Sequence, residues 1–124
     1  MMVSAAVMLG LGLAMTFAPR ELLAYTGSAA TPLGTLVVQV AGGLYLGFAM
    51  LNWMAKENLI GGIYGRPVAL GNFLHFFIVA AALVRAEAGV HRQGAMLVGA
   101  MVYVPLAAWF GVVTFTSPVG KKAA

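Results

Sequence analysis

The sequence contains no cysteine and no aspartate, and charged residues fill only 8% of its 124 positions. Soluble domains carry roughly 25% charged residues, so a soluble fold could not cover its surface with so few. The absence of cysteine rules out disulfides, thiolate metal sites and thiol redox chemistry within the chain. The three carboxylates, Glu21, Glu57 and Glu87, lie at the ends of apolar runs. We therefore do not expect transport coupled to a carboxylate buried in the membrane.

Hydrophobic residues make up 62% of the chain and fall into four runs, at about 1–18, 33–55, 67–84 and 94–116. At 1.5 Å per residue, even the 18-residue runs reach about 27 Å, which is enough to span a bilayer. The connections are short, which favours antiparallel neighbours. The sequence therefore predicts an all-α, polytopic membrane protein. Its expected fold is an antiparallel four-helix transmembrane bundle, with residues 1–124 forming a single transmembrane domain.

Proline residues lie at the starts of two predicted spans. Pro32 follows Thr31 at the start of the second run, and Pro67 opens the third. Proline suits the first turn of a helix, and a threonine just before it can cap the free backbone N–H groups. We expect the second helix to begin with Thr31 as its N-cap.

The formal net charge is +4, from seven Lys or Arg residues against three Glu. All ten lie near span ends, where they can anchor helices among lipid headgroups, and we do not expect nucleic-acid binding. If both termini share one side, that side carries four basic residues, Lys56, Arg66, Lys121 and Lys122, against three on the other. The positive-inside rule then favours both termini in the cytoplasm.

Small residues recur along one face of each predicted span and indicate close helix packing. Gly43 and Gly47 form a GxxxG pair in the second span, Gly10 lies in the first and Gly99 in the fourth. In lipid, such faces let two backbones approach closely. These four glycines are the expected helix-packing residues. The pattern leaves open whether the contact is within one chain or between copies.

A polar layer is predicted near mid-membrane. His75 lies near the middle of the third span, and Asn72 shares its helix face. Both should face protein, because an unsatisfied polar group is costly in hydrocarbon. Tyr45 and Tyr103 lie at matching depth in the second and fourth spans, and Asn52 lies near the depth of Asn72. These five residues either hold helices together or form a ligand-binding site.

No residue is assigned a catalytic role, and no metal or cofactor is expected. The chain shows no Ser–His–acid set, no phosphate-binding loop and no metal-ligand spacing. His91 lies 16 residues beyond His75 at the membrane edge, so the two histidines cannot share one haem iron within a chain. Acid–base work by the polar layer would be the one route to an enzyme.

Two segments resemble a broad set of small bacterial four-helix membrane proteins, loosely DoxX-like in architecture. They are "LNWMA", with Asn52 and Trp53, and "GRPVALGN", with Asn72. In that set an Asn-Trp pair closes the second helix and Leu-Gly-Asn opens the third. The resemblance implies a four-helix bundle in the bacterial cytoplasmic (inner) membrane and carries over no activity.

Two functions follow as expectations. The first is an accessory or scaffold integral membrane protein that packs against other membrane subunits or against itself. The alternative is a small-molecule or lipid-binding protein that uses the polar layer. The expected partners are membrane lipids, together with a second copy of the chain or a larger membrane complex.

Overall fold

The computed structural model describes residues 1–57, 65–88 and 94–116, and these residues are helical apart from short turns. The helices are α1 (Met2–Phe17), α2 (Pro19–Tyr25), α3 (Pro32–Met54), the 3-10 turn η1 (Ala55–Glu57), α4 (Gly65–Glu87) and α5 (Gly94–Phe115). The chain divides into two compact units, Met1–Lys56 and Glu57–Ala124, and each is described by itself. The predicted all-α class is confirmed.

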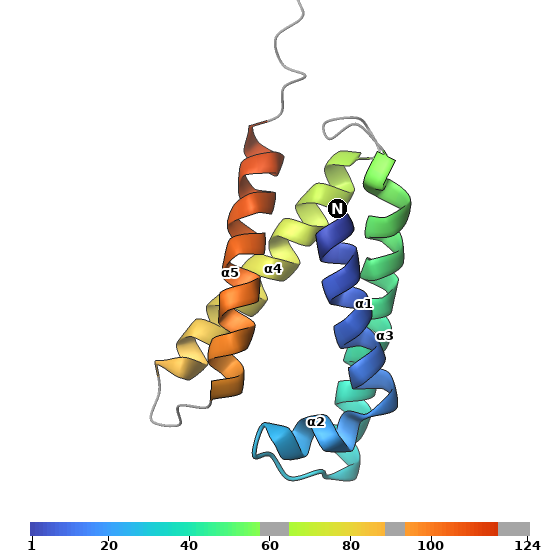
Figure 1. The fold of residues 1–124 in the computed structure, drawn as a ribbon, viewed down its shortest axis with the longest axis vertical. Coiled ribbons are helices and arrows are strands. Elements are labelled where there is room, and N and C mark those ends of the chain that lie inside the picture. Colours follow the sequence, from blue (N-terminus) through green and yellow to red (C-terminus); the bar gives the residue numbers. More distant parts are fainter. Residues whose placement is uncertain (58–64, 89–93, 117–124) are drawn as a thin grey trace, which may run out of the picture. The chain divides into compact units, whose positions relative to one another are not determined.

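In the first unit, α1 and α3 lie side by side and run in opposite directions, and α2 crosses one end of the pair (Figure 1). The chain bends by 102° between α1 and α2. The bend falls at Ala18, which has non-helical backbone angles and precedes Pro19. This placement follows from proline sterics, since the residue before a proline is disfavoured in the helical region.

The start of α3 has the predicted cap. Pro32 occupies the first turn, and the backbone N–H of Gly34 donates to Oγ1 of Thr31 at 3.0 Å. The side chain thus satisfies one of the N–H groups that every helix start leaves without an intrahelical partner. The predicted N-cap at Thr31 is confirmed.

The second unit is a pair of long helices, α4 and α5, which pack along each other (Figure 1). Its interior holds Phe76, Phe110 and Tyr103, with the small residues Ala69, Ala80, Ala100 and Ala107. Pro105 lies inside α5 without ending it. Transmembrane helices tolerate such interior prolines more readily than soluble ones.

Three helical segments are long and apolar enough to cross a membrane: Pro32–Glu57, Gly65–Ala86 and Gly94–Phe115. They correspond to the predicted spans 33–55, 67–84 and 94–116. The first predicted span, 1–18, contains the 16-residue α1, which reaches membrane-spanning length only when counted together with the bent α2. The four-helix bundle and the single domain stay predictions. Arg92, Lys121 and Lys122, which entered the predicted orientation, lie outside the described residues.

Candidate functional site

Asn72 and His75 lie one turn apart on α4. Asn72 is fully buried, and its side-chain Nδ2 donates to the carbonyl oxygen of Val68 at 2.8 Å, one turn back in the same helix. This bond satisfies part of the amide within α4 itself, which lowers the cost of burying it. His75 is half-buried.

The ring of His75 lies beside that of Tyr103 on α5, with centroids 5.9 Å apart and planes tilted by 52°. The ring of Phe76 lies next to both, with its centroid 5.3 Å from that of His75 and 5.4 Å from that of Tyr103. Phe76 also stacks on Phe110, with ring centroids 5.5 Å apart. The structure thus brings together His75 and Tyr103 of the predicted layer, within a cluster of aromatic rings.

The remaining two residues of the predicted layer, Tyr45 and Asn52, belong to the first unit. Asn52 is fully buried, and its Nδ2 donates to the thioether sulfur of Met8 on α1 at 3.6 Å. Tyr45 is half-buried on α3. The five residues therefore divide between the α4–α5 pair and the α1–α3 pair.

Two glycines that sequence reasoning did not single out make the close approach between α1 and α3. A Cβ atom on Gly42 would lie 2.5 Å from Oγ1 and 2.9 Å from the backbone nitrogen of Thr16. A Cβ atom on Gly12 would lie 2.9 Å from the side chain of Leu46. A side chain at Gly42 would require the backbone of α1 to shift, and a side chain at Gly12 would require at least the Leu46 side chain to move.

The four glycines expected to pack have different surroundings. A Cβ atom on Gly99 would lie 3.1 Å from Leu83, across the α4–α5 contact. At Gly10, Gly43 and Gly47, a Cβ atom would meet no other described atom within 4 Å. Gly43 and Gly47 are exposed, one helical step or more away from the face of α3 that meets α1.

One stripe of exposed residues on α3 has a regular repeat. Its members alternate steps of three and four positions along nearly the whole helix: Leu33, Leu36, Val40, Gly43, Gly47, Met50 and Met54. We call these seven residues the outer seam. A 3–4 repeat is the spacing by which one helix packs lengthwise on another. In the outer seam the two glycines stand near the middle.

Two apolar grooves accompany these helix pairs. One, of about 400 Å³, lies between α1 and α3 and is lined by Ala5, Ala6, Leu9, Leu46, Ala49, Met50 and Trp53. The other, of about 470 Å³, lies along α4 and α5 and is lined by residues such as Phe73, Phe77 and Ala107. His75 lines neither of these two grooves.

Charged groups are sparse at both helix pairs. Within residues 1–57, 65–88 and 94–116, no three His, Cys, Asp or Glu side chains gather closely enough to hold a metal ion. One cation has a defined contact: Nζ of Lys56 lies 3.8 Å from the centre of the Trp53 ring. Sequence reasoning missed this contact, although the spacing of three residues at a helix end is its signal.

Searches against protein-family models, curated proteins and solved structures found no match. The resemblance to DoxX-like proteins therefore stays a prediction.

Proposed function

We propose that this chain is a scaffold protein of the bacterial cytoplasmic membrane that associates through the outer seam of α3 with a second copy of itself. In this proposal both termini lie in the cytoplasm. Three helical segments long and apolar enough to cross a bilayer support the membrane location. The short connections between the helical segments are consistent with a protein that works by packing.

The observation that carries the proposal is the position of Gly43 and Gly47 on a face of α3 that α1 does not cover. A face that met only lipid would gain nothing from two glycines, since lipid tails accommodate large side chains. A face that met another helix would gain a close backbone approach at the glycines. The flanking Val40 and Met50 would then pack on either side of that approach.

We infer that the occupant of the outer seam is a second copy of the chain. In a parallel pair related by a twofold axis, each residue lies at the same depth as its equivalent in the other copy. The glycines near the middle of one seam would then face those of the other, where the helices come closest. The larger Leu33 and Met54 would meet at the two ends, where the helix axes diverge.

The second candidate is binding of a small molecule or lipid beside His75 and Tyr103. The adjacency of their rings favours it, because an imidazole and a phenol together can donate and accept hydrogen bonds. Against it stands the position of the two apolar grooves, neither of which is lined by His75.

Native mass spectrometry of the protein in lipid discs distinguishes these candidates. We expect the wild type to appear as a dimer and the Gly43→Ile/Gly47→Ile variant as a monomer. The matched control is Gly10→Ile, which also fills open space but lies on α1 outside the outer seam. If the spectrum instead shows a complex with a different membrane subunit, that subunit and not a second copy would be the partner of the outer seam. A monomer that retains a small molecule, lost in His75→Phe, would overturn the scaffold proposal in favour of the second candidate.

A further inference from the structure

The groove between α1 and α3 is almost entirely apolar. Three small residues line it, the buried Ala5 and Ala49 and the exposed Ala6, together with the larger Leu9 and Trp53. Its volume of about 400 Å³ falls in the range of sites that hold small ligands. In a bilayer, a groove with this apolar lining is suited to a hydrocarbon chain and not to a polar solute.

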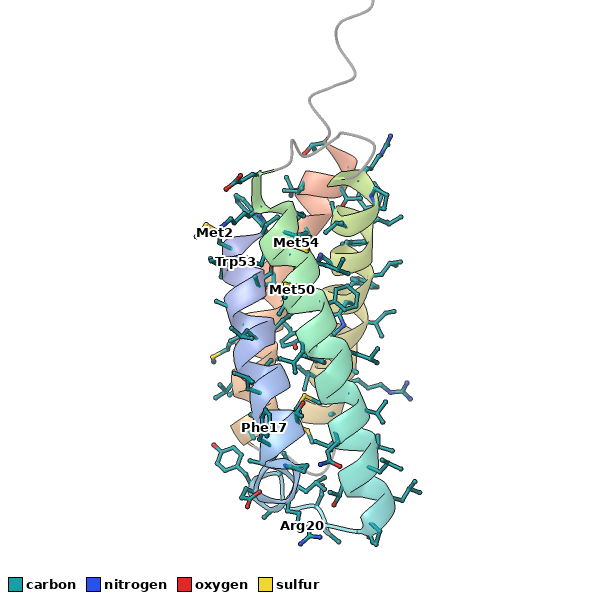
Figure 2. The ribbon with its side chains drawn as sticks, turned by 90° about the vertical axis from the view of Figure 1, so that its right-hand side faces the viewer. Met2, Phe17, Arg20, Met50, Trp53 and Met54 are labelled. Carbon is teal, nitrogen blue, oxygen red and sulfur yellow. The ribbon has the colours of Figure 1, made fainter. Side chains whose placement is uncertain are left out.

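The groove has a cation at one end. Trp53 lines the groove, and Lys56 holds its ammonium group 3.8 Å from the centre of the Trp53 ring. The cation–π contact keeps this exposed side chain near the groove. Figure 2 shows Trp53 at the same end of the α1–α3 pair as Met2, while Phe17 and Arg20 lie at the other end.

The position of Lys56 along the helix sets the depth of this cation. Lys56 belongs to η1, at the very end of the segment Pro32–Glu57 that is long and apolar enough to span a bilayer. Tryptophan and lysine at span ends lie at the level of the lipid headgroups. The adjacent Glu57 is also exposed, which makes the local charge mixed. Of these two charged groups, the ammonium of Lys56 is the one held against Trp53, which lines the groove.

We propose that the groove between α1 and α3 binds one acyl chain of an anionic phospholipid, whose phosphate pairs with Lys56. The apolar lining of the groove takes the acyl chain, and the ammonium of Lys56 provides the charge complement at headgroup depth. A zwitterionic lipid would bring its own ammonium group toward Lys56 and so gain less from this arrangement. The proposal rests on the membrane location proposed above. It does not rest on association through the outer seam, although Met50 borders both.

The two tryptophans of the chain allow a direct test by fluorescence quenching. Trp109→Phe leaves Trp53 as the sole tryptophan, and Trp53→Phe leaves the exposed Trp109 on α5 as a reporter of bulk lipid. Each variant is placed in phosphatidylcholine vesicles that contain a small fraction of phosphatidylglycerol, with bromine on the acyl chains of one lipid or the other. Bromine quenches only the tryptophans that its chain contacts.

We expect Trp53 to favour brominated phosphatidylglycerol over brominated phosphatidylcholine by about fivefold, which matches the usual effect of one lysine near a membrane surface. Trp109 should show no such preference. Lys56→Gln should remove the preference and leave the quenching, whereas Ala6→Leu, which fills the groove, should remove the groove-specific quenching of Trp53. Arg20→Gln, which neutralises an exposed cation at the opposite end, is the matched charge control and should change nothing.

Three results would overturn the proposal: equal quenching of Trp53 by both lipids, a preference that survives Lys56→Gln, or no quenching of Trp53 while Trp109 is quenched. The last result would mean that protein covers the groove. Gly43→Ile/Gly47→Ile should keep the lipid preference, so failure of the lipid site and failure of the scaffold proposal give different results.

Discussion

Gly42 of α3 faces Thr16 of α1 so closely that a Cβ atom on the glycine would lie 2.5 Å from the threonine Oγ1. The next residue, Gly43, faces open space. One step of about 100° around α3 therefore separates a glycine that the α1–α3 pair requires from one that the pair does not use. This difference divides α3 into an inner face, which meets α1, and the outer seam.

Gly42→Ala and Gly43→Ala form a matched pair for this division. We expect Gly42→Ala to lower the free energy of unfolding by about 1–3 kcal/mol, because the new methyl group forces α1 and α3 apart. Gly43→Ala should leave it unchanged or slightly raised, since alanine favours helix more than glycine does. Denaturation of the monomer in detergent micelles, followed by circular dichroism, measures both. Equal stability of the two variants would contradict the assignment of the inner face.

The hydrogen bond between Asn52 and Met8 links α3 to α1. Both side chains are fully buried, and the donor–acceptor distance is 3.6 Å. Because polar contacts between membrane helices are weak, we expect a coupling of about 0.6 kcal/mol in a double-mutant cycle of Asn52→Leu and Met8→Leu. The cycle uses the same micelle unfolding assay. A coupling near zero would show that the two side chains contribute to stability independently.

The helices could be predicted from the sequence because their causes are local. Apolar runs long enough to span a bilayer predicted α3, α4 and α5, and Thr31 with Pro32 predicted where α3 begins. The break between α1 and α2 falls at Ala18, the last residue of the first predicted span, just before Pro19. Proline chemistry accounts for its position.

The face of α3 that meets α1 could not be predicted in the same way. Packing through Gly43 and Gly47 stays a prediction, whereas the α1–α3 contact uses Gly42 and Gly12. In an almost uniformly apolar helix, polarity does not distinguish the inner face from the outer one, so spacing alone admits several registers. The hydrogen bond from Asn52 to Met8 could not be predicted from the sequence either, because methionine is apolar by composition and is not expected to pair with a buried amide.

Phe76 is expected to be the main packing residue between α4 and α5. It is fully buried and contacts His75, Tyr103 and Phe110. Phe76→Ala should cost about 3–5 kcal/mol of unfolding free energy, the usual range for loss of a buried aromatic ring. Phe77→Ala, which truncates the exposed neighbouring ring, should cost far less. Similar losses for the two variants, measured by denaturant titration in micelles, would contradict the assigned interior.

His75→Phe tests whether the histidine holds helices or binds a ligand. A phenylalanine ring can keep the contacts with Phe76 and Tyr103, so the scaffold account expects a change in unfolding free energy below about 1 kcal/mol. It also expects an unchanged dimer in native mass spectrometry. Loss of a bound small molecule from this variant, with the fold intact by circular dichroism, would support the second candidate function.

A cysteine scan along α3 in native membranes tests the outer seam most directly, because the wild-type chain has no cysteine to interfere. Single cysteines would replace residues of the outer seam, such as Val40, Gly43 and Gly47, and exposed residues beside it, such as Val37 and Leu44. After mild oxidation, we expect disulfide-linked dimers to peak at the seam positions, in alternating steps of three and four residues, and to be weak at Val37 and Leu44. Uniform cross-linking around α3, or none at the seam positions, would contradict association of two copies through this face.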